Sequence, residues 1–287
     1  MDQRIISLFD DYTHQPLSRK EFLEKLVKLA GGTALAAAAL ALLEPGYAAA
    51  ATVDAEPDAG KLITEDVTWP SGATTMRGYL VRPQGRKKRG AVIVIHENRG
   101  LTPHIKDVTR RVAQAGYLAL GVDALSPFGG TPANEDEGRK LIGQLDPAQN
   151  LSNYQRGFDY LLARPESNGR LGCVGFCWGG AMASRLATAD PRLAAAVSYY
   201  GTQPKAEDVP AIKAKLLLHY AALDERVNAG MAAYEAALKA NGIAYEQYVY
   251  EGVNHAFNND TSPARYNAAA AKLAWERTLR IFKDKLS

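Results

Sequence analysis

The strongest constraint on the fold is a series of short apolar runs, rich in β-branched residues, that alternate with helical patterns. The runs are "GAVIVIHE" (90–97), "LALGVDAL" (118–125), "LGCVGF" (171–176) and "AKLLLHYAALD" (214–224). A continuous apolar run is typical of a strand buried on both faces. Because helical patterns separate such runs, the sequence predicts an α/β fold with a mostly parallel sheet and helices on both faces.

Weaker patterns fill in the rest of the chain. Residues 62–69 and 74–83 alternate in polarity around a "PSGA" turn, which predicts two antiparallel strands. A final helix is expected from Pro263 to about Lys285. The polar, Gly- and Pro-rich segment 127–151 leaves room for a small lid or entrance loop, and none for a cap domain.

The overall charge argues against a nucleic-acid partner. The formal net charge is only +3, and basic residues are not interleaved with aromatic ones as in nucleic-acid-binding surfaces. One dense basic run, "GRKKRG" (85–90), lies between two expected strands and is interpreted as a solvated hairpin loop. No exposed apolar stripe stands out, so we expect a monomer.

The N-terminal segment has the composition of an export signal. Arg19 and Lys20 precede an Ala-rich apolar run (26–43), and a helix-breaking "EPG" and small residues at 48–50 follow. Such a segment with small residues at its end is typical of a cleaved signal. With Lys28 inside it, the apolar run is a poor membrane span.

This segment is similar to a twin-arginine export signal, although the pair reads Arg19-Lys20 and Glu24 stands where lysine is usual. The resemblance implies that the export machinery is a partner and that the location is periplasmic or extracytoplasmic. We therefore expect residues 1–51 to form a signal outside the fold and residues 52–287 to form the functional domain. The alternative is a surface amphipathic helix of the mature protein.

A cysteine stands where many hydrolases carry a serine. Gly175, Cys177 and Gly179 form the G-x-C-x-G pattern of a nucleophile elbow, at the end of one expected strand and the start of a helix. The backbone is strained at such an elbow, and small neighbours let the chains approach closely. The helix N-terminus favours the thiolate, so Cys177 is the candidate nucleophile.

Two further residues follow in the order that a catalytic triad requires. Asp224 ends one expected strand, and His255 in "YEGVNHAF" follows the next. Sites in parallel sheets lie at the carboxyl ends of the strands. Cys177, Asp224 and His255 are therefore predicted to act as nucleophile, orienting acid and base.

Other histidines and the second cysteine have simpler interpretations. Cys173 is interpreted as a small core residue, and His96 and His219 as hydrogen-bonded structural or supporting histidines. His14 falls in the expected signal, and His104 at the entry to a helix. No pair of candidate ligands has metal-ligand spacing, so neither a metal nor a cofactor is predicted.

With these motifs and "HENRG" (96–100), the chain resembles the dienelactone hydrolase family of the α/β-hydrolase fold over nearly all of residues 62–287. The resemblance implies hydrolysis of an ester or lactone through a thioester. It also implies that Glu97 contacts the resting thiol, and that the backbone N–H groups of Trp178 and Asn98 bind the oxyanion.

The resemblance implies a carboxylate-binding arginine after the catalytic histidine, yet Asn258 and Asn259 stand there. Arg99 is a candidate for that role, with a structural ion pair as the equal alternative. Tyr199 and Tyr200, at a strand end, are candidates to line the substrate pocket, with core packing as the alternative.

Two other functions remain open. The fold could serve as a non-catalytic binding or scaffold protein. It could also carry an esterase or peptidase activity on larger acyl substrates, which a lid within 127–151 would help. The expected partner is otherwise a small-molecule ester or lactone.

Overall fold

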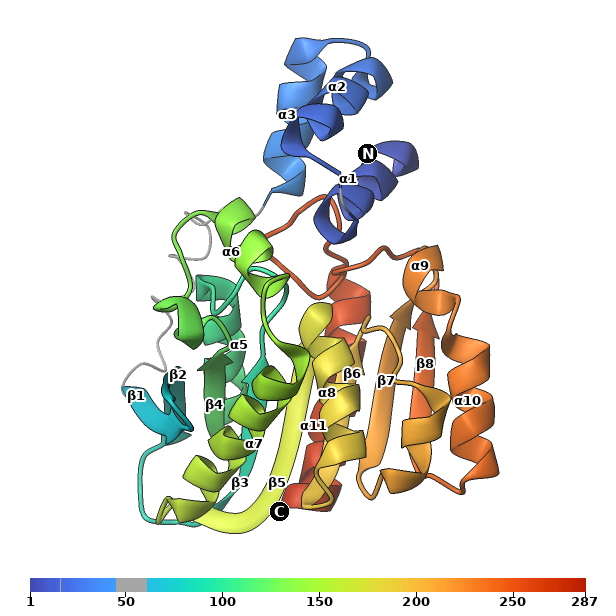
Figure 1. Cartoon of the computed structure of the whole chain (residues 1–287). Coiled ribbons are helices and arrows are strands. Elements are labelled where there is room, and N and C mark those ends of the chain that lie inside the picture. The colour runs from blue at the N-terminus through green and yellow to red at the C-terminus, as the bar shows by residue number, and fades with distance from the viewer. Residues whose placement is uncertain (16, 45–60) are drawn as a thin grey trace.

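In the computed structural model, which describes residues 1–15, 17–44 and 61–287, an eight-stranded sheet forms the centre of the molecule (Figure 1). Its strand order is β1-β2-β4-β3-β5-β6-β7-β8. Strand β2 runs antiparallel to β1 and β4, and all other neighbours are parallel. The strands are β1 (Leu62–Ser71), β2 (Thr74–Pro83), β3 (Arg89–Ile95), β4 (Leu118–Asp123), β5 (Ser167–Phe176), β6 (Leu193–Tyr199), β7 (Lys215–Ala221) and β8 (Tyr245–Tyr250).

Helices cover both faces of the sheet, as the apolar runs predict. Helices α7, α8 and α10 contribute to the apolar core on one face, and α5 and α11 to the core on the other. The predicted mostly parallel α/β sheet is thus confirmed. The helices of this part are α5 (Pro103–Gln114), α6 (Glu135–Ile142), α7 (Pro147–Ala163), α8 (Trp178–Ala189), α9 (Glu225–Asn228), α10 (Met231–Ala240) and α11 (Ala268–Leu286), with 3₁₀ turns at Ser126–Phe128 and Ala206–Ala211.

Three local predictions are corrected. The last helix begins at Ala268, five residues after Pro263, because the side chain of Asn267 caps it by accepting a hydrogen bond from Ala270 N–H. The basic run 85–90 is not a hairpin loop, since β4 lies between the two strands that it joins. The segment 127–151 is not a plain loop, because it contains α6 and the start of α7.

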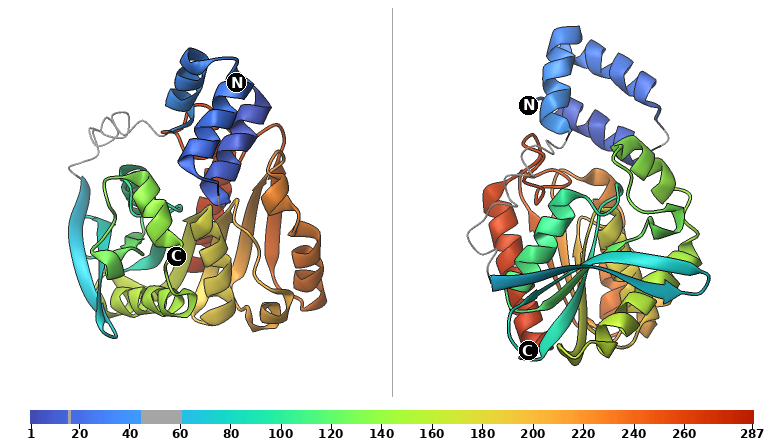
Figure 2. Two further views of the ribbon diagram at one scale, coloured as in Figure 1. Left: turned by 45° about the horizontal axis from the view of Figure 1, so that its top comes forward. Right: turned by 90° about the vertical axis from the view of Figure 1, so that its left-hand side faces the viewer.

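The N-terminal segment forms three helices, α1 (Gln3–His14), α2 (Arg19–Ala30) and α3 (Thr33–Leu43), which pack on one another through an apolar cluster of their own. Figure 2 shows them over the edge of the sheet at which the parallel strands end. Ala264 N–H donates to Leu42 O at 3.2 Å, and Ala264 packs against the cluster.

The sequence predicted a signal outside the fold, whereas helices α1–α3 pack against the rest of the described chain; whether the mature protein keeps them, as the alternative of an amphipathic helix requires, remains a prediction. The expected processing site at 48–50 lies outside the described residues, so export and cleavage remain predictions. Among the described helices, none is long and apolar enough by itself to span a membrane. Together, α2 and α3 meet that length and composition, although the chain bends by 114° between them.

Candidate active site

The backbone at Cys177 has the strained geometry of a nucleophile elbow. Its φ is 57° and its ψ is −117°, between the end of β5 and the start of α8. A Cβ atom on Gly175 would lie 1.9 Å from Gly179 O, and one on Gly179 would lie 2.4 Å from His96 O. Only glycine fits at these positions, so the sequence pattern and the tight turn have the same physical cause.

Asp224 and His255 meet beside the elbow. His255 Nδ1 lies 2.6 Å from Asp224 Oδ2, and the two side chains are almost fully buried. Burial disfavours the charged imidazolium, but the negative charges of Asp224 and of Cys177 in its ionised form outweigh it and raise the pKa of His255 to about 10, so His255 holds the proton once the thiol has released it. Burial likewise opposes the Asp224 carboxylate, while the charge of His255 lowers the pKa of Asp224 below its usual value.

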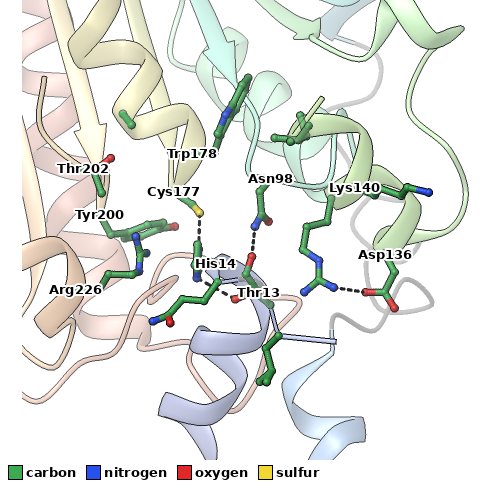
Figure 3. Close-up of a pocket in the computed structure, with 16 residues that line it drawn as sticks. Thr13, His14, Asn98, Asp136, Lys140, Cys177, Trp178, Tyr200, Thr202 and Arg226 are labelled. Carbon is green, nitrogen blue, oxygen red and sulfur yellow. Dashed lines mark hydrogen bonds and ion pairs between the residues drawn. The ribbon is translucent and has the colours of Figure 1, made fainter. Parts of the chain in front are cut away.

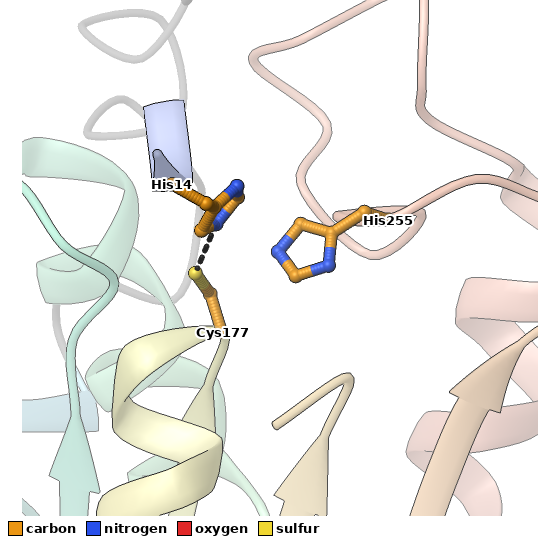
Figure 4. A group of neighbouring side chains, drawn as sticks. All are labelled: His14, Cys177 and His255. Carbon is orange, nitrogen blue, oxygen red and sulfur yellow. Dashed lines mark hydrogen bonds between the residues drawn. The ribbon is translucent and has the colours of Figure 1, made fainter. Parts of the chain in front are cut away.

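A third side chain, which the sequence patterns did not predict for the site, contacts the Cys177 thiol. His14 Nε2 is 3.1 Å from Cys177 Sγ (Figures 3 and 4). The centres of the His14 and His255 rings are 4.6 Å apart, and the rings meet edge to face. The signal that could have found it is the apolar spacing of Ile5, Phe9 and Tyr12, which gives α1 a face that must be buried.

Glu97 does not occupy the position that the family resemblance implies. Its carboxylate accepts a hydrogen bond from Asn259 Nδ2 at 2.9 Å, and the hydrogen-bond partner of the Cys177 thiol is His14. Glu97 does border the small cavity that also contains Cys177 and His255. Glu97 is therefore close to the site, but the Asn259 amide, rather than the Cys177 thiol, fixes the orientation of its carboxylate.

The two backbone groups predicted for the oxyanion hole lie near the thiol. Trp178 is the first residue of α8, and a helix N-terminus leaves its N–H groups without partners inside the helix. Asn98 follows β3, and its side chain donates to Thr13 O at 2.8 Å. Both residues border the same cavity as Cys177, and their role in the oxyanion hole remains a prediction.

The structure gives both predicted substrate-binding residues partners within the protein. Arg99 forms the structural ion pair, with its Nη1 3.0 Å from Glu135 Oε2. Tyr199 is fully buried, and its hydroxyl lies 2.8 Å from Thr278 Oγ1. Tyr200, the residue after β6, has a φ of 41° and borders the cavity in its place.

The structural interpretations of the other residues are confirmed. Cys173 is fully buried in the core beneath the sheet. Burial lowers the pKa of His219 to about 3, and its ring nitrogens face Tyr250 Oη and Thr278 Oγ1. His96 accepts from Ala124 N–H and stacks on Trp178.

A cavity of about 490 Å³ opens beside the thiol (Figure 3). Three parts of the chain supply its walls: the end of α1 and the residues after it, helix α6, and the ends of the central strands. The lining residues are Thr13, His14, Gln15, Leu17, Asn98, Asp136, Arg139, Lys140, Ile142, Gly143, Cys177, Trp178, Ala181, Tyr200, Thr202 and Arg226.

His14, Cys177 and His255 could also hold a metal ion, contrary to the expectation from spacing. One donor atom of each lies within 4.8 Å of the others, and Figure 4 shows the three side chains together. The second ring nitrogens face Asp10 O and Asp224 Oδ2, an arrangement typical of histidines that bind metals. Imidazole and thiolate ligands suit Zn²⁺.

We therefore expect Zn²⁺ to slow the alkylation of Cys177 by iodoacetamide, because a metal-bound thiolate is less available. In His14→Ala, which lacks one donor, the Zn²⁺ concentration needed for protection is expected to rise at least about tenfold. Peptide mapping of the alkylated cysteine measures the effect. Asp11→Ala, an exposed change on the same helix, is the matched control. If the same Zn²⁺ concentration protected Cys177 from alkylation in His14→Ala and in the wild type, the metal would bind elsewhere.

Comparisons with known proteins agree with this geometry. The dienelactone hydrolase family model matches residues 76–286. A "Putative carboxymethylenebutenolidase" of Escherichia coli K12 is 32% identical over 251 residues, covering 82% of this chain and 92% of that protein. One of Synechocystis is 31% identical, covering 77% of this chain and 96% of that protein.

Solved structures give the same result. A "Putative Dienelactone Hydrolase" of Klebsiella pneumoniae superposes with a TM-score of 0.70 at 30% identity, covering 77% of this chain and 98% of that one. An esterase of Rhizomucor miehei, at 12% identity and a TM-score of 0.65, covers 99% of this chain and 97% of its own, which shows a shared fold alone. This chain belongs to the dienelactone hydrolase family and is an α/β-hydrolase that acts on ester or lactone bonds.

Proposed function

We propose that the protein hydrolyses small carboxylic esters or lactones through a triad of Cys177, Asp224 and His255. The observation that carries the proposal is the orientation of the His255 ring. Its Nδ1 is hydrogen-bonded to the Asp224 carboxylate, whereas its buried Nε2 has no hydrogen-bond partner among the described residues. A donor nitrogen of that ring lies within 4.8 Å of Cys177 Sγ, so the free nitrogen is available to take the thiol proton.

The reaction then follows from these positions. The thiol proton passes to His255 Nε2, and the sulfur attacks the carbonyl carbon to form a C–S bond. The N–H groups of Trp178 and Asn98 stabilise the oxyanion. Collapse breaks the C–O bond, and the leaving oxygen takes the proton from His255. Water, activated by the same imidazole, then hydrolyses the thioester.

The lining of the cavity favours a small substrate with an acidic group. Its volume of about 490 Å³ is in the range of small-molecule sites. Trp178 and Tyr200 give it an aromatic wall, and Arg226 and Lys140 add positive charge. Since Arg99 is paired with Glu135, we infer that Arg226 faces the carboxylate of a dienelactone-type substrate.

The other functions considered from the sequence have less support. Larger acyl substrates need a wide opening, whereas α6 and the N-terminal helices border this cavity. A scaffold protein would not need the bond between His255 and Asp224. The scaffold alternative predicts no acyl-enzyme from a small ester, and this separates it from the proposal.

The test is to trap the intermediate. After mixing with p-nitrophenyl acetate and quenching in acid, we expect an acetyl group on the peptide that contains Cys177, together with a burst of p-nitrophenol. Asp224→Asn is expected to lower the burst rate by about 10²- to 10⁴-fold, because the imidazole loses its orienting carboxylate. Mass spectrometry locates the acetyl group. Turnover without acetylated Cys177 would disprove the thioester mechanism.

A further inference from the structure

Helix α1 is held against the hydrolase domain by polar contacts from several elements. Asp10 Oδ1 lies 3.2 Å from Arg265 Nη1, in the loop after β8. The Tyr12 hydroxyl donates to Asp136 Oδ1 on α6 at 2.6 Å. Arg265 is 6% exposed and Tyr12 is 2% exposed. Buried charges need partners, so these contacts fix one position of α1.

Aromatic rings strengthen the same contact. Phe9 is fully buried, with the guanidinium groups of Arg265 and Arg99 at 4.9 Å and 5.8 Å from its ring centre. The guanidinium of Arg139 lies 4.0 Å from the centre of the Tyr12 ring. Cations over aromatic faces are attracted most when they are removed from water. Helix α1 therefore buries an apolar face on arginines that the hydrolase domain supplies.

The hydrogen bonds of His14 fix its tautomer. Its Nδ1 lies 2.8 Å from the carbonyl oxygen of Asp10, which can only accept, so Nδ1 carries the proton. With that proton on Nδ1, a neutral ring presents its Nε2 lone pair to the Cys177 sulfur at 3.1 Å. It can accept the S–H proton in a hydrogen bond.

We propose that helices α1–α3 are a resident cap of the active site and that His14 is the positioning residue that holds the resting Cys177 thiol. The proposal rests on the thiol chemistry inferred above. At rest the S–H bond points to His14; when substrate enters, it turns to the free Nε2 of His255. No covalent bond forms or breaks in this turn. His14 thus has the place that the family resemblance implied for Glu97.

A resident cap requires that the N-terminal helices stay attached to the protein, whereas a cleaved export signal requires that the same residues be removed. Arg19, in the motif similar to an export signal, is paired with Asp136 on α6 and with Glu44. Cleavage near residues 48–52 would separate the cap from the domain that it covers. The cap therefore predicts that the active protein keeps residues 1–44.

The experiment measures alkylation of Cys177 by iodoacetamide in the full chain, without substrate, from pH 5 to pH 9. A hydrogen bond to a neutral thiol disfavours the thiolate. In His14→Ala, alkylation at pH 7 is expected to be about 2- to 10-fold faster, and the pH profile to move down by about half to one unit. His14→Gln, whose amide oxygen can accept, is expected to lie nearer the wild type.

Controls separate the hydrogen bond from general loosening. Asp11→Ala, exposed on α1, is expected to leave the rate and profile unchanged. Asp10→Ala removes the ion pair with Arg265 and keeps the backbone carbonyl that binds His14. We expect it to raise the alkylation rate of Cys177 by loosening the cap. This variant replaces His14→Ala in the experiment if His14→Ala does not fold. The charged groups around the thiol that also shape the profile are Asp10 on α1, Glu97 after β3, Asp224 after β7, Arg226 on α9, and His255 and Arg265 after β8.

Two results would overturn the proposal. One is an unchanged rate and profile in both His14→Ala and Asp10→Ala. The other is active enzyme that begins near residues 50–52, with no bound N-terminal fragment, by intact mass. The alkylation readout needs no turnover, so it remains informative if Cys177 proves not to be the nucleophile. Conversely, the acetyl-trapping test can succeed in a protein that lacks the cap.

Discussion

Cys177→Ala is expected to lower kcat/KM for a small aryl ester by at least about 10³-fold, because no other group can form the acyl intermediate. Only the effects of the oxyanion site and of substrate binding would remain. In the wild type, the rate is expected to depend on ionisations between about pH 5 and pH 9, as thiol and imidazole chemistry requires. Initial rates of the purified full chain across pH measure both.

Cys177→Ser is the matched control for this experiment. It keeps a nucleophile of similar size at the elbow, so its activity is expected to lie between those of the wild type and Cys177→Ala. Thermal unfolding should show that all three proteins are folded. Equal low rates in the wild type and in Cys177→Ala would mean that the elbow is only architecture, and the scaffold function would then be favoured.

Gly175→Ala is expected to have the largest effect on stability. Its new Cβ would lie 1.9 Å from Gly179 O and 2.9 Å from Gly180 N, both of which are backbone atoms. A clash with backbone cannot be relieved by turning a side chain, so β5 and α8 would have to separate. We expect a loss of more than about 4 kcal/mol in the free energy of unfolding, or no soluble protein. Urea unfolding measures the change.

Gly143→Ala is the control, since its φ is −67° and the nearest atom to its Cβ would lie 3.5 Å away. An alanine fits there, and the free energy of unfolding is expected to change by less than about 1 kcal/mol. If Gly175→Ala unfolded at the same urea concentration as this control, the close approach of β5 and α8 would be wrong.

The sequence by itself determined the sheet and the order of the triad residues. Apolar runs such as residues 90–97 can be satisfied only by burial on both faces, so they predict central strands without knowledge of their partners. Cys177 directly follows β5, Asp224 and His255 come three and five residues after the ends of β7 and β8, and parallel strands end at a common edge. Local patterns therefore suffice to bring these residues together.

Only the tertiary structure decided which neighbours each side chain meets. Arg99 is paired because α6 brings Glu135 to it, and Tyr199 is in the core because Tyr200 takes the side that faces the cavity. His14 is separated from Cys177 by 163 positions, and it precedes a segment that is equally compatible with an export signal. Its contact with the thiol depends on the docking of α1 against Arg265 and Asp136. Such long-range contacts have no local pattern in the sequence, and packing alone determines them.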